Sequence, residues 1–270
     1  MKTLLLAGFA LLSTTALAQD IRVKIEDFSF TYDDPKGSGE ATLFEHNQRG
    51  AEGVTVEVEK IDEAMNFKVS GSENHEFTLK DAPDVVMKAR SMTVDDLDLS
   101  YQDQLSFSVL EGEFLGADDE LRLKDFKLNC NKDLTQELPE NQLILGCLQK
   151  MSVKSQSFSQ AAVDDGFVRA MTKSLAAVAG TRGDLSIRDL EFKVTGGKYD
   201  LAADVKAQVS GKAKSNGNLS YDPKTATLTI KISEVKFGFL NVTGMVFDEL
   251  KKNENDKMKV KQPNVYYKLK

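Results

Sequence analysis

A short pattern of alternating apolar and polar residues recurs along this chain, and each copy changes phase at its middle. In LRLKDFKL the apolar residues Leu121 and Leu123 fall on odd positions, whereas Phe126 and Leu128 fall on even ones. A fifth copy, from Leu228, keeps the phase change but lacks the central Asp that the others share. The three remaining copies, VKIEDFSF, MTVDDLDL and LSIRDLEF, begin at Val23, Met92 and Leu185.

The phase change predicts a β-bulge in the middle of each strand. Side chains on a regular strand alternate between its two faces, so an uncorrected slip would send half of the apolar residues into solvent. A bulge inserts one extra residue, returns both apolar pairs to one face and bends the strand. The alternative is a pair of short strands joined by a kink, which predicts similar burial with less continuous pairing. We favour the bulge.

We therefore expect a mainly β, β-rich α+β fold. Its long, bulged, strongly curved antiparallel sheets would form a groove, a barrel or a sandwich. Residues 131–141 are expected to form a polar loop, and residues 143–151 are compatible with a helix as well as a strand. Alternation between turn-forming residues predicts strands within 21–45 and over 54–60, 65–70, 76–79, 85–101, 105–110, 121–130, 143–158, 201–209, 227–237 and 258–269, the last divided at Pro263.

Two helices are expected. One is amphipathic and lies near residues 160–179, with Gly180 as its C-terminal cap. The other is short and lies near 246–252. Helices of this size cannot cover so large a sheet. The sheet must therefore fold on itself, or its apolar face must be covered by something else. The apolar face of the longer helix would carry Val163, Phe167, Met171, Leu175 and Val178.

The first residues have the composition of a bacterial secretory signal. Lys2 precedes a short apolar run, and Ala16-Leu17-Ala18 forms a small-x-small cleavage site. Cleavage after Ala18 would deliver a periplasmic or secreted protein. We divide the chain into a signal peptide (1–18), an N-terminal β-rich region (19–158) and a C-terminal region of helix and curved sheet (159–270); the last two are compatible with one continuous domain. The formal net charge of −7 argues against binding of nucleic acid, which requires a basic surface.

Cys130 and Cys147 are the two cysteines of the chain. In an oxidising compartment such a pair is first interpreted as a disulfide. Closing the intervening loop would contribute about 3 kcal/mol in the chain-entropy model. Metal ligation and a redox pair are the alternatives, but a metal needs more ligands and redox pairs more often have CxxC spacing.

No catalytic motif, cofactor fingerprint or metal-binding motif is present in the sequence, so we expect a protein that is not an enzyme. His46 and His75 lie in turn-like contexts and are expected to be solvated. Acidic residues cluster at 95–98, 118–120 and 164–165, where calcium is an alternative to the favoured role of Asp in bulges, turns and helix starts.

The C-terminal segment is rich in lysine, and Lys257, Lys259 and Lys261 share one face of the last expected strand. Lysine on an edge strand blocks pairing with other sheets, which is the favoured interpretation. The alternative is peripheral contact with anionic lipid headgroups or with an acidic partner.

The segments GKAKSNGNLSYDPKTATLTIKISEVKFGF (Gly211–Phe239) and VFDELKK (Val246–Lys252) resemble the lipid-binding TULIP proteins, including bacterial periplasmic relatives. The units LRLKDFKL and LSIRDLEF resemble the strands of AsmA-type proteins. The resemblance covers less than half of the chain and rests on pattern and element order. It implies curved sheets whose apolar concave face holds acyl chains, and it transfers no functional residue.

The leading hypothesis is thus a non-enzymatic periplasmic binding protein for lipid or another hydrophobic ligand, held on the concave face of a curved sheet. The alternative is a structural or protein-interaction module of the cell envelope with a closed β core. An enzyme assembled from distant residues is a third possibility. The candidate ligand-lining residues are Phe167, Met171, Leu185, Ile187, Leu190, Phe192, Leu201, Val205, Val209, Leu228, Ile230, Val235 and Phe237.

Overall fold

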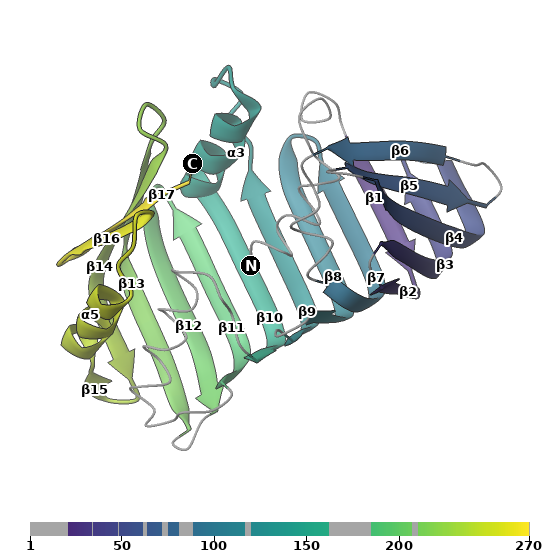
Figure 1. Ribbon diagram of the computed structural model, residues 1–270. Helices are drawn as coiled ribbons and strands as arrows, with labels where there is room; N and C mark the ends of the chain where they lie inside the picture. Colours follow the sequence, from purple (N-terminus) through teal and green to yellow (C-terminus); the bar gives the residue numbers. More distant parts are fainter. Residues whose placement is uncertain are drawn as a thin grey trace. The chain divides into compact units, whose positions relative to one another are not determined.

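The protein is mainly β, as expected, and its paired strands are antiparallel (Figure 1). The computed structural model describes residues 21–33, 35–47, 49–61, 64–71, 75–80, 89–116, 120–161, 185–206 and 210–269. Its contacts divide the chain into two compact units. Unit 1 comprises Met1–Gln102 and Ser106–Phe126, and unit 2 comprises Asp103–Leu105 and Lys127–Lys270. The sequence placed a boundary near residue 158, whereas this division falls within a strand.

Unit 1 is a sheet in which an early strand is inserted between two later ones. β3 pairs with β4, β4 with β5, and β5 with β6. β1 and β2 lie end to end between β3 and β7. Its strands are β1 (Ile21–Glu26), β2 (Phe28–Asp33), β3 (Lys36–His46), β4 (Arg49–Ile61), β5 (Ala64–Ser70), β6 (His75–Lys80) and β7 (Ala89–Tyr101), with parts of β8 (Gln104–Gly116) and β9 (Glu120–Asn131).

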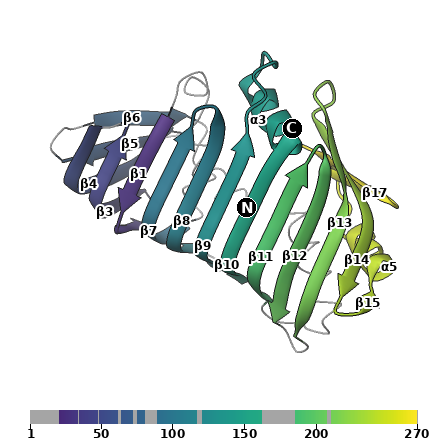
Figure 2. The ribbon, with the colours of Figure 1, turned by 180° about the vertical axis from the view of Figure 1, so that it is seen from behind.

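Unit 2 contains a meander of long strands, which lie side by side in both views (Figure 1 and Figure 2). β14 is followed by a short hairpin strand, a helix and a closing hairpin whose last strand returns to pair with β14. The elements after β9 are α3 (Pro139–Gln149), β10 (Lys150–Ala161), β11 (Leu185–Thr195), β12 (Lys198–Lys206), β13 (Gly211–Asp222), β14 (Thr227–Phe237), β15 (Leu240–Asn241), α5 (Thr243–Lys252), β16 (Met258–Lys261) and β17 (Asn264–Lys268).

The phase changes in the sequence coincide with a special backbone conformation. The central Asp of each of the four copies adopts a positive φ, a left-handed conformation that Asp tolerates better than most residues. A residue of this kind lets a strand advance by one position without turning its apolar side chains to solvent. The φ angles are 49° at Asp27, 46° at Asp96, 45° at Asp125 and 47° at Asp189.

In unit 2 the phase change is a bulge, as predicted. β11 pairs with β12 through Arg188↔Asp204 and then Glu191↔Ala202, so β11 has one residue more than its partner. The apolar side chains on both sides of the bulge, Ile187 and Val194, are buried. The copy that begins at Leu228 lacks the central Asp but also forms a bulge. Between Glu234 and Ile232, β14 has one residue more than β13.

In unit 1 the alternative interpretation holds at Asp27. This residue separates β1 from β2, and the register on both neighbours continues across it without a shift. β7 changes phase at Asp96, on the strand directly beside the break. Because both strands change phase together, Val23 stays opposite Leu99 and the register needs no extra residue.

One expected strand is partly a helix. The segment 143–158 was predicted as a strand, with a helix left open for 143–151; α3 occupies Pro139–Gln149 and β10 begins at Lys150. The expected loop over 131–141 therefore ends in the first turn of α3. Pro139 sits in that turn, where its missing N–H and fixed φ favour a helix start.

The C-terminal expectations are confirmed. β14 spans the predicted residues, α5 begins three residues before the predicted start at Val246, and the last strand is divided by a turn at Gln262–Pro263. The signal peptide and most of the amphipathic helix expected near 160–179 lie outside the described residues.

Candidate functional site

The candidate site is one side of the sheet in unit 2, which we call the apolar face. It consists of the side chains that β11, β12, β13 and β14 direct to the same side of the sheet. Its members are Ile187, Leu190, Phe192, Val194, Tyr199, Leu201, Ala203, Val205, Ala213, Ser215, Leu228, Ile230, Ile232, Val235 and Phe237.

Strand register explains why these residues share a side. Residues directly opposite each other in antiparallel strands project to the same face. Val194 is opposite Tyr199, and Ala203 is opposite Ala213. The bulges in β11 and β14 keep the residues on both sides of each bulge on this face.

Aromatic rings fill the positions where the face carries glycine. Tyr199 lies opposite Gly217, and a Cβ on Gly217 would come within 2.7 Å of the Tyr199 ring. In the same way, a Cβ on Gly211 would come within 2.8 Å of the Phe237 ring. The structure shows that aromatic side chains of the face itself make close approaches over its glycines.

The polar atoms on the apolar face are paired. The Tyr199 hydroxyl and Ser215 Oγ lie 3.2 Å apart in a buried hydrogen bond. Burial raises the pKa of Tyr199, and the hydrogen bond from Ser215 opposes that shift only in part. The phenol therefore stays neutral, and the face presents no charged group among the members named above.

Helix α5 and the closing hairpin pack against one end of this face. Phe247 and Leu250 of α5 are buried in the same cluster as Met258 and Val265. Figure 1 shows α5 beside β14 and β15. The helix contacts β14 and β16. Sequence reasoning did not include these residues in the lining, although the spacing of Val246, Phe247 and Leu250 is the apolar pattern of a helix.

The structure brings the described candidate residues together. Ile187, Val205, Ile230, Val235 and Phe237 are buried on the apolar face, whereas Leu190, Phe192, Leu201 and Leu228 are partly buried there. Val194 and Tyr199 were missed, although both continue the alternation of their strands. Phe167, Met171 and Val209 lie outside the described residues, as does the side chain of Leu185.

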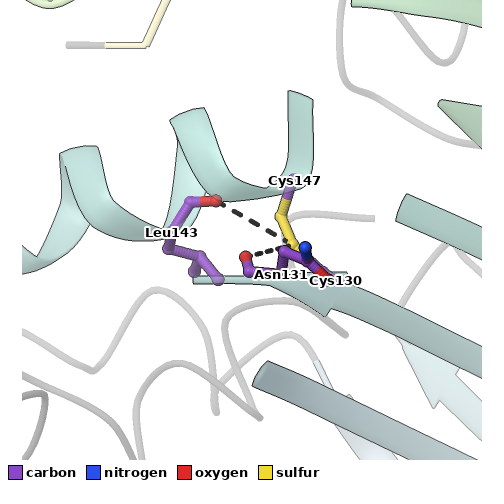
Figure 3. The surroundings of a disulfide bond; sticks show 4 residues. All are labelled: Cys130, Asn131, Leu143 and Cys147. Atoms are coloured by element: carbon purple, nitrogen blue, oxygen red, sulfur yellow. Dashed lines mark hydrogen bonds between the residues drawn. A yellow bond between two sulfur atoms is a disulfide. The ribbon is translucent and has the colours of Figure 1, made fainter. Parts of the chain in front are cut away.

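The predicted disulfide joins Cys130 and Cys147, whose Cα atoms are 4.7 Å apart (Figure 3). It ties the end of β9 to α3, and Cys130 is buried. Its Sγ lies 3.9 Å from the carbonyl oxygen of Leu143 (Figure 3). The helix approaches β9 so closely that Gly146 has no space for a side chain against the backbone of Asn131. The bridge thus joins two elements that are in close contact.

The acidic cluster at 95–98 lies where unit 1 changes phase. Partial desolvation, followed by the charges of Asp96 and Asp27, raises the pKa of Asp95. Thr42 Oγ1 donates a hydrogen bond to Asp27 at 2.9 Å. Within the ranges that the structure describes, no group of His, Cys, Asp or Glu is arranged to hold a metal ion.

The histidines lie in strands, not in the turns that the sequence indicated. His46 is the last residue of β3, and His75 is the first residue of β6. The prediction overlooked that both stretches continue the pairing of their neighbours, since His46 lies opposite Val23.

The lysine-rich segment forms β16, which pairs with β17. Lys259 and Lys261 are exposed, while Met258 and Val260 are buried. The N–H of Val260 donates to the carboxylate of Glu254 at 2.6 Å. A strand so short, charged and capped by a side chain has the features that protect sheet edges.

Comparisons of this chain with protein-family models, with curated proteins and with solved structures found no match. In the described ranges, neither helix has the length and apolar character needed to cross a membrane. The apolar face thus consists of apolar side chains, with Tyr199 and Ser215 as the polar side chains among its members named above.

Proposed function

We propose that the protein is a non-enzymatic binding protein for lipid or another hydrophobic ligand, and that the apolar face of β11–β14 holds the ligand. The observation that supports this proposal is the continuity of that face across four strands, maintained by the bulges in β11 and β14. Ligand sites for small molecules are mostly apolar, with few polar groups, and Tyr199 with Ser215 is such a polar pair.

The distribution of exposure on the face also favours a ligand. Its larger aliphatic and aromatic side chains at Leu190, Phe192, Leu201 and Leu228 are partly exposed, although they lie beside buried neighbours. Helix α5 contacts β14 and β16, at one edge of the face. An acyl chain lying along these partly exposed side chains would remove further apolar surface from water.

The proposed location is the periplasm or the cell exterior. The disulfide favours an oxidising compartment, and the leader-like residues 1–18 favour export. The similarity of the strand pattern to TULIP and AsmA-type proteins agrees with a lipid ligand in the cell envelope.

A structural or protein-interaction module of the envelope is the second candidate. Val194, Val205 and Ala213 each retain only 1% of their exposure, which is the burial of a closed core. A core packed to this degree needs no ligand for stability.

Native mass spectrometry of gently purified protein separates these candidates, with organic extraction of any bound material. A discrete added mass that extracts as phospholipid or fatty acid supports the binding protein and identifies its ligand class. A ligand-free mass, combined with no uptake of a fluorescent fatty acid, refutes the proposal and favours the structural module.

A further inference from the structure

The hairpin formed by β14 and β15 lies at one end of the sheet in unit 2. Phe237 pairs with Leu240 across a two-residue turn of Gly238 and Phe239. Gly238 takes a φ of 58°, which a tight hairpin turn requires and glycine provides without strain. The Gly238 N–H donates to the carbonyl of Lys212 at 2.8 Å, so the turn is fixed to β13.

Three large apolar side chains are exposed on this hairpin and on the first turn of α5, and we call them the apolar tip. Phe239 is 93% exposed, Leu240 is 53% exposed and Met245, in the first turn of α5, is 55% exposed. The link between β15 and α5 is also fixed, since the Thr243 N–H and hydroxyl both donate to Asn241 Oδ1. β15 and α5 lie side by side (Figure 1).

The tip is part of an uncharged stretch in a highly charged protein. No residue from Phe237 to Phe247 is charged, although 29% of the chain is. Other apolar residues of this stretch, such as Val242 and Phe247, are buried in the core of unit 2. The stretch thus contributes one set of side chains to the core and presents the other to solvent.

The size of the tip favours a lipid surface over a protein partner. A fully exposed large side chain presents about 200 Å², so the tip presents about 400 Å². A stable protein interface takes about 800 Å² from each partner. Insertion into the interfacial zone of a bilayer has no such minimum area, because its strength scales with the apolar surface that is buried, and Phe and Leu are typical of the inserted side.

Two lysines on the strands beside the hairpin have ion-pair partners. Lys236 forms an ion pair with Glu234 at 2.8 Å, and Lys212 lies 3.7 Å from Asp204. These lysines are therefore not free positive charges that would require an anionic headgroup. We propose that the apolar tip inserts into the interfacial zone of a phospholipid bilayer, and that this insertion depends on apolar contact more than on charge.

The inference is independent of the ligand proposed for the apolar face, and it differs from membrane contact through the lysines of β16. Screening by salt weakens contact between exposed lysines and anionic lipid. Apolar insertion should persist in high salt and on zwitterionic lipid.

Flotation of the purified protein with phosphatidylcholine vesicles tests the inference. We expect the protein to float with the vesicles in low and high salt, and Phe239→Glu to reduce the bound fraction at least tenfold. The matched control is Leu134→Glu, which changes another exposed leucine (65%) in the loop before α3, at the opposite end of these strands. The control should float like the wild type, and circular dichroism should show both variants folded.

Four results would overturn the inference. Absence of the wild-type protein from the floated fraction is the first. Equal flotation of wild type and Phe239→Glu is the second. The third is binding that requires anionic phosphatidylglycerol, disappears in high salt and is lost in Lys259→Glu/Lys261→Glu. A dimer that Phe239→Glu dissociates in sedimentation analysis would likewise assign the tip to a second copy of the chain.

Discussion

The positive φ of Asp189 leads to a sharp prediction about stability. A left-handed conformation costs an ordinary residue about 1–2 kcal/mol, less for Asp and almost nothing for Gly. With its φ of 47°, Asp189 should therefore accept Gly with a free energy of unfolding unchanged or raised by up to about 1 kcal/mol. A β-branched residue is worst suited to this conformation. Asp189→Val should therefore lower the free energy of unfolding by about 2 kcal/mol or more.

Removal of the residue tests the bulge in a different way. Deleting Asp189 would leave Ile187, Leu190 and Phe192 on alternate positions, so a plain strand would keep them on one face. Pairing with β12 would then run without a shift, but pairing with β10, which is in step across Asp189, would be displaced by one residue. Because one or two backbone hydrogen bonds to β10 would be lost, we expect the deletion variant to fold with a free energy of unfolding lowered by about 1–3 kcal/mol.

Urea unfolding followed by far-UV circular dichroism measures these effects, because the chain has no Trp for fluorescence. Arg188→Val is the matched control. It places Val at the neighbouring exposed position, whose φ is not positive. Because strands favour Val, we expect little change in the free energy of unfolding. If Asp189→Val is as mild as Arg188→Val, the left-handed conformation at Asp189 does not limit stability. If the deletion variant fails to fold, the apolar side chains of β11 do not share one face and the reasoning is wrong.

Three other perturbations test other parts of the structure. Val205→Glu should lower the free energy of unfolding by about 3–5 kcal/mol, because Val205 is 1% exposed; an unchanged melting temperature with loss of lipid binding would show that the face is open. Cys147→Ser should cost about 2–5 kcal/mol in thermal or urea unfolding, and stability equal to wild type under oxidising conditions would contradict a structural bridge. Folding raises the pKa of Asp95, so its protonated form favours the fold and stability falls as pH rises from the unfolded pKa through the folded one. Asp95→Asn should therefore stabilise the protein near neutral pH and flatten this slope in a pH series of melting temperatures; a loss of stability there would disprove the unfavourable charge.

Local sequence was sufficient for features that depend on neighbouring residues. Alternation located β14 to the residue, and the phase changes located the four central Asp residues at which the backbone takes a positive φ. The pairing of Cys130 with Cys147 followed from the compartment and the absence of other partners.

Features that depend on distant residues were not predictable. The insertion of β1 and β2 between β3 and β7 has no local signal, so the in-register break at Asp27 was expected to be a bulge. Helix α3 was expected mainly as a strand because its apolar residues also fit a strand pattern over a short window. Its helical form is accompanied by close packing of Gly146 on Asn131 and by the disulfide.

The candidate site was predictable in composition but not in exposure. Alternation places Leu201 and Val205 on the same face, yet only the folded sheet shows that one is partly exposed and the other buried. The position of aromatic rings over Gly211 and Gly217 likewise depends on the pairing of strands that are distant in sequence.

The closing hairpin has a consequence for chain ends made by proteolysis or by truncated expression. β17 occupies the outer edge of β14 over Thr227–Lys231, and the carbonyl of Pro263 accepts the next free donor, the N–H of Ile232. A chain cut before Met258 would lose these partners and leave a long apolar strand with open hydrogen-bonding groups. Such an edge recruits strands from other molecules. Residues 258–268 therefore cover this edge of β14, and their removal should promote self-association of the protein.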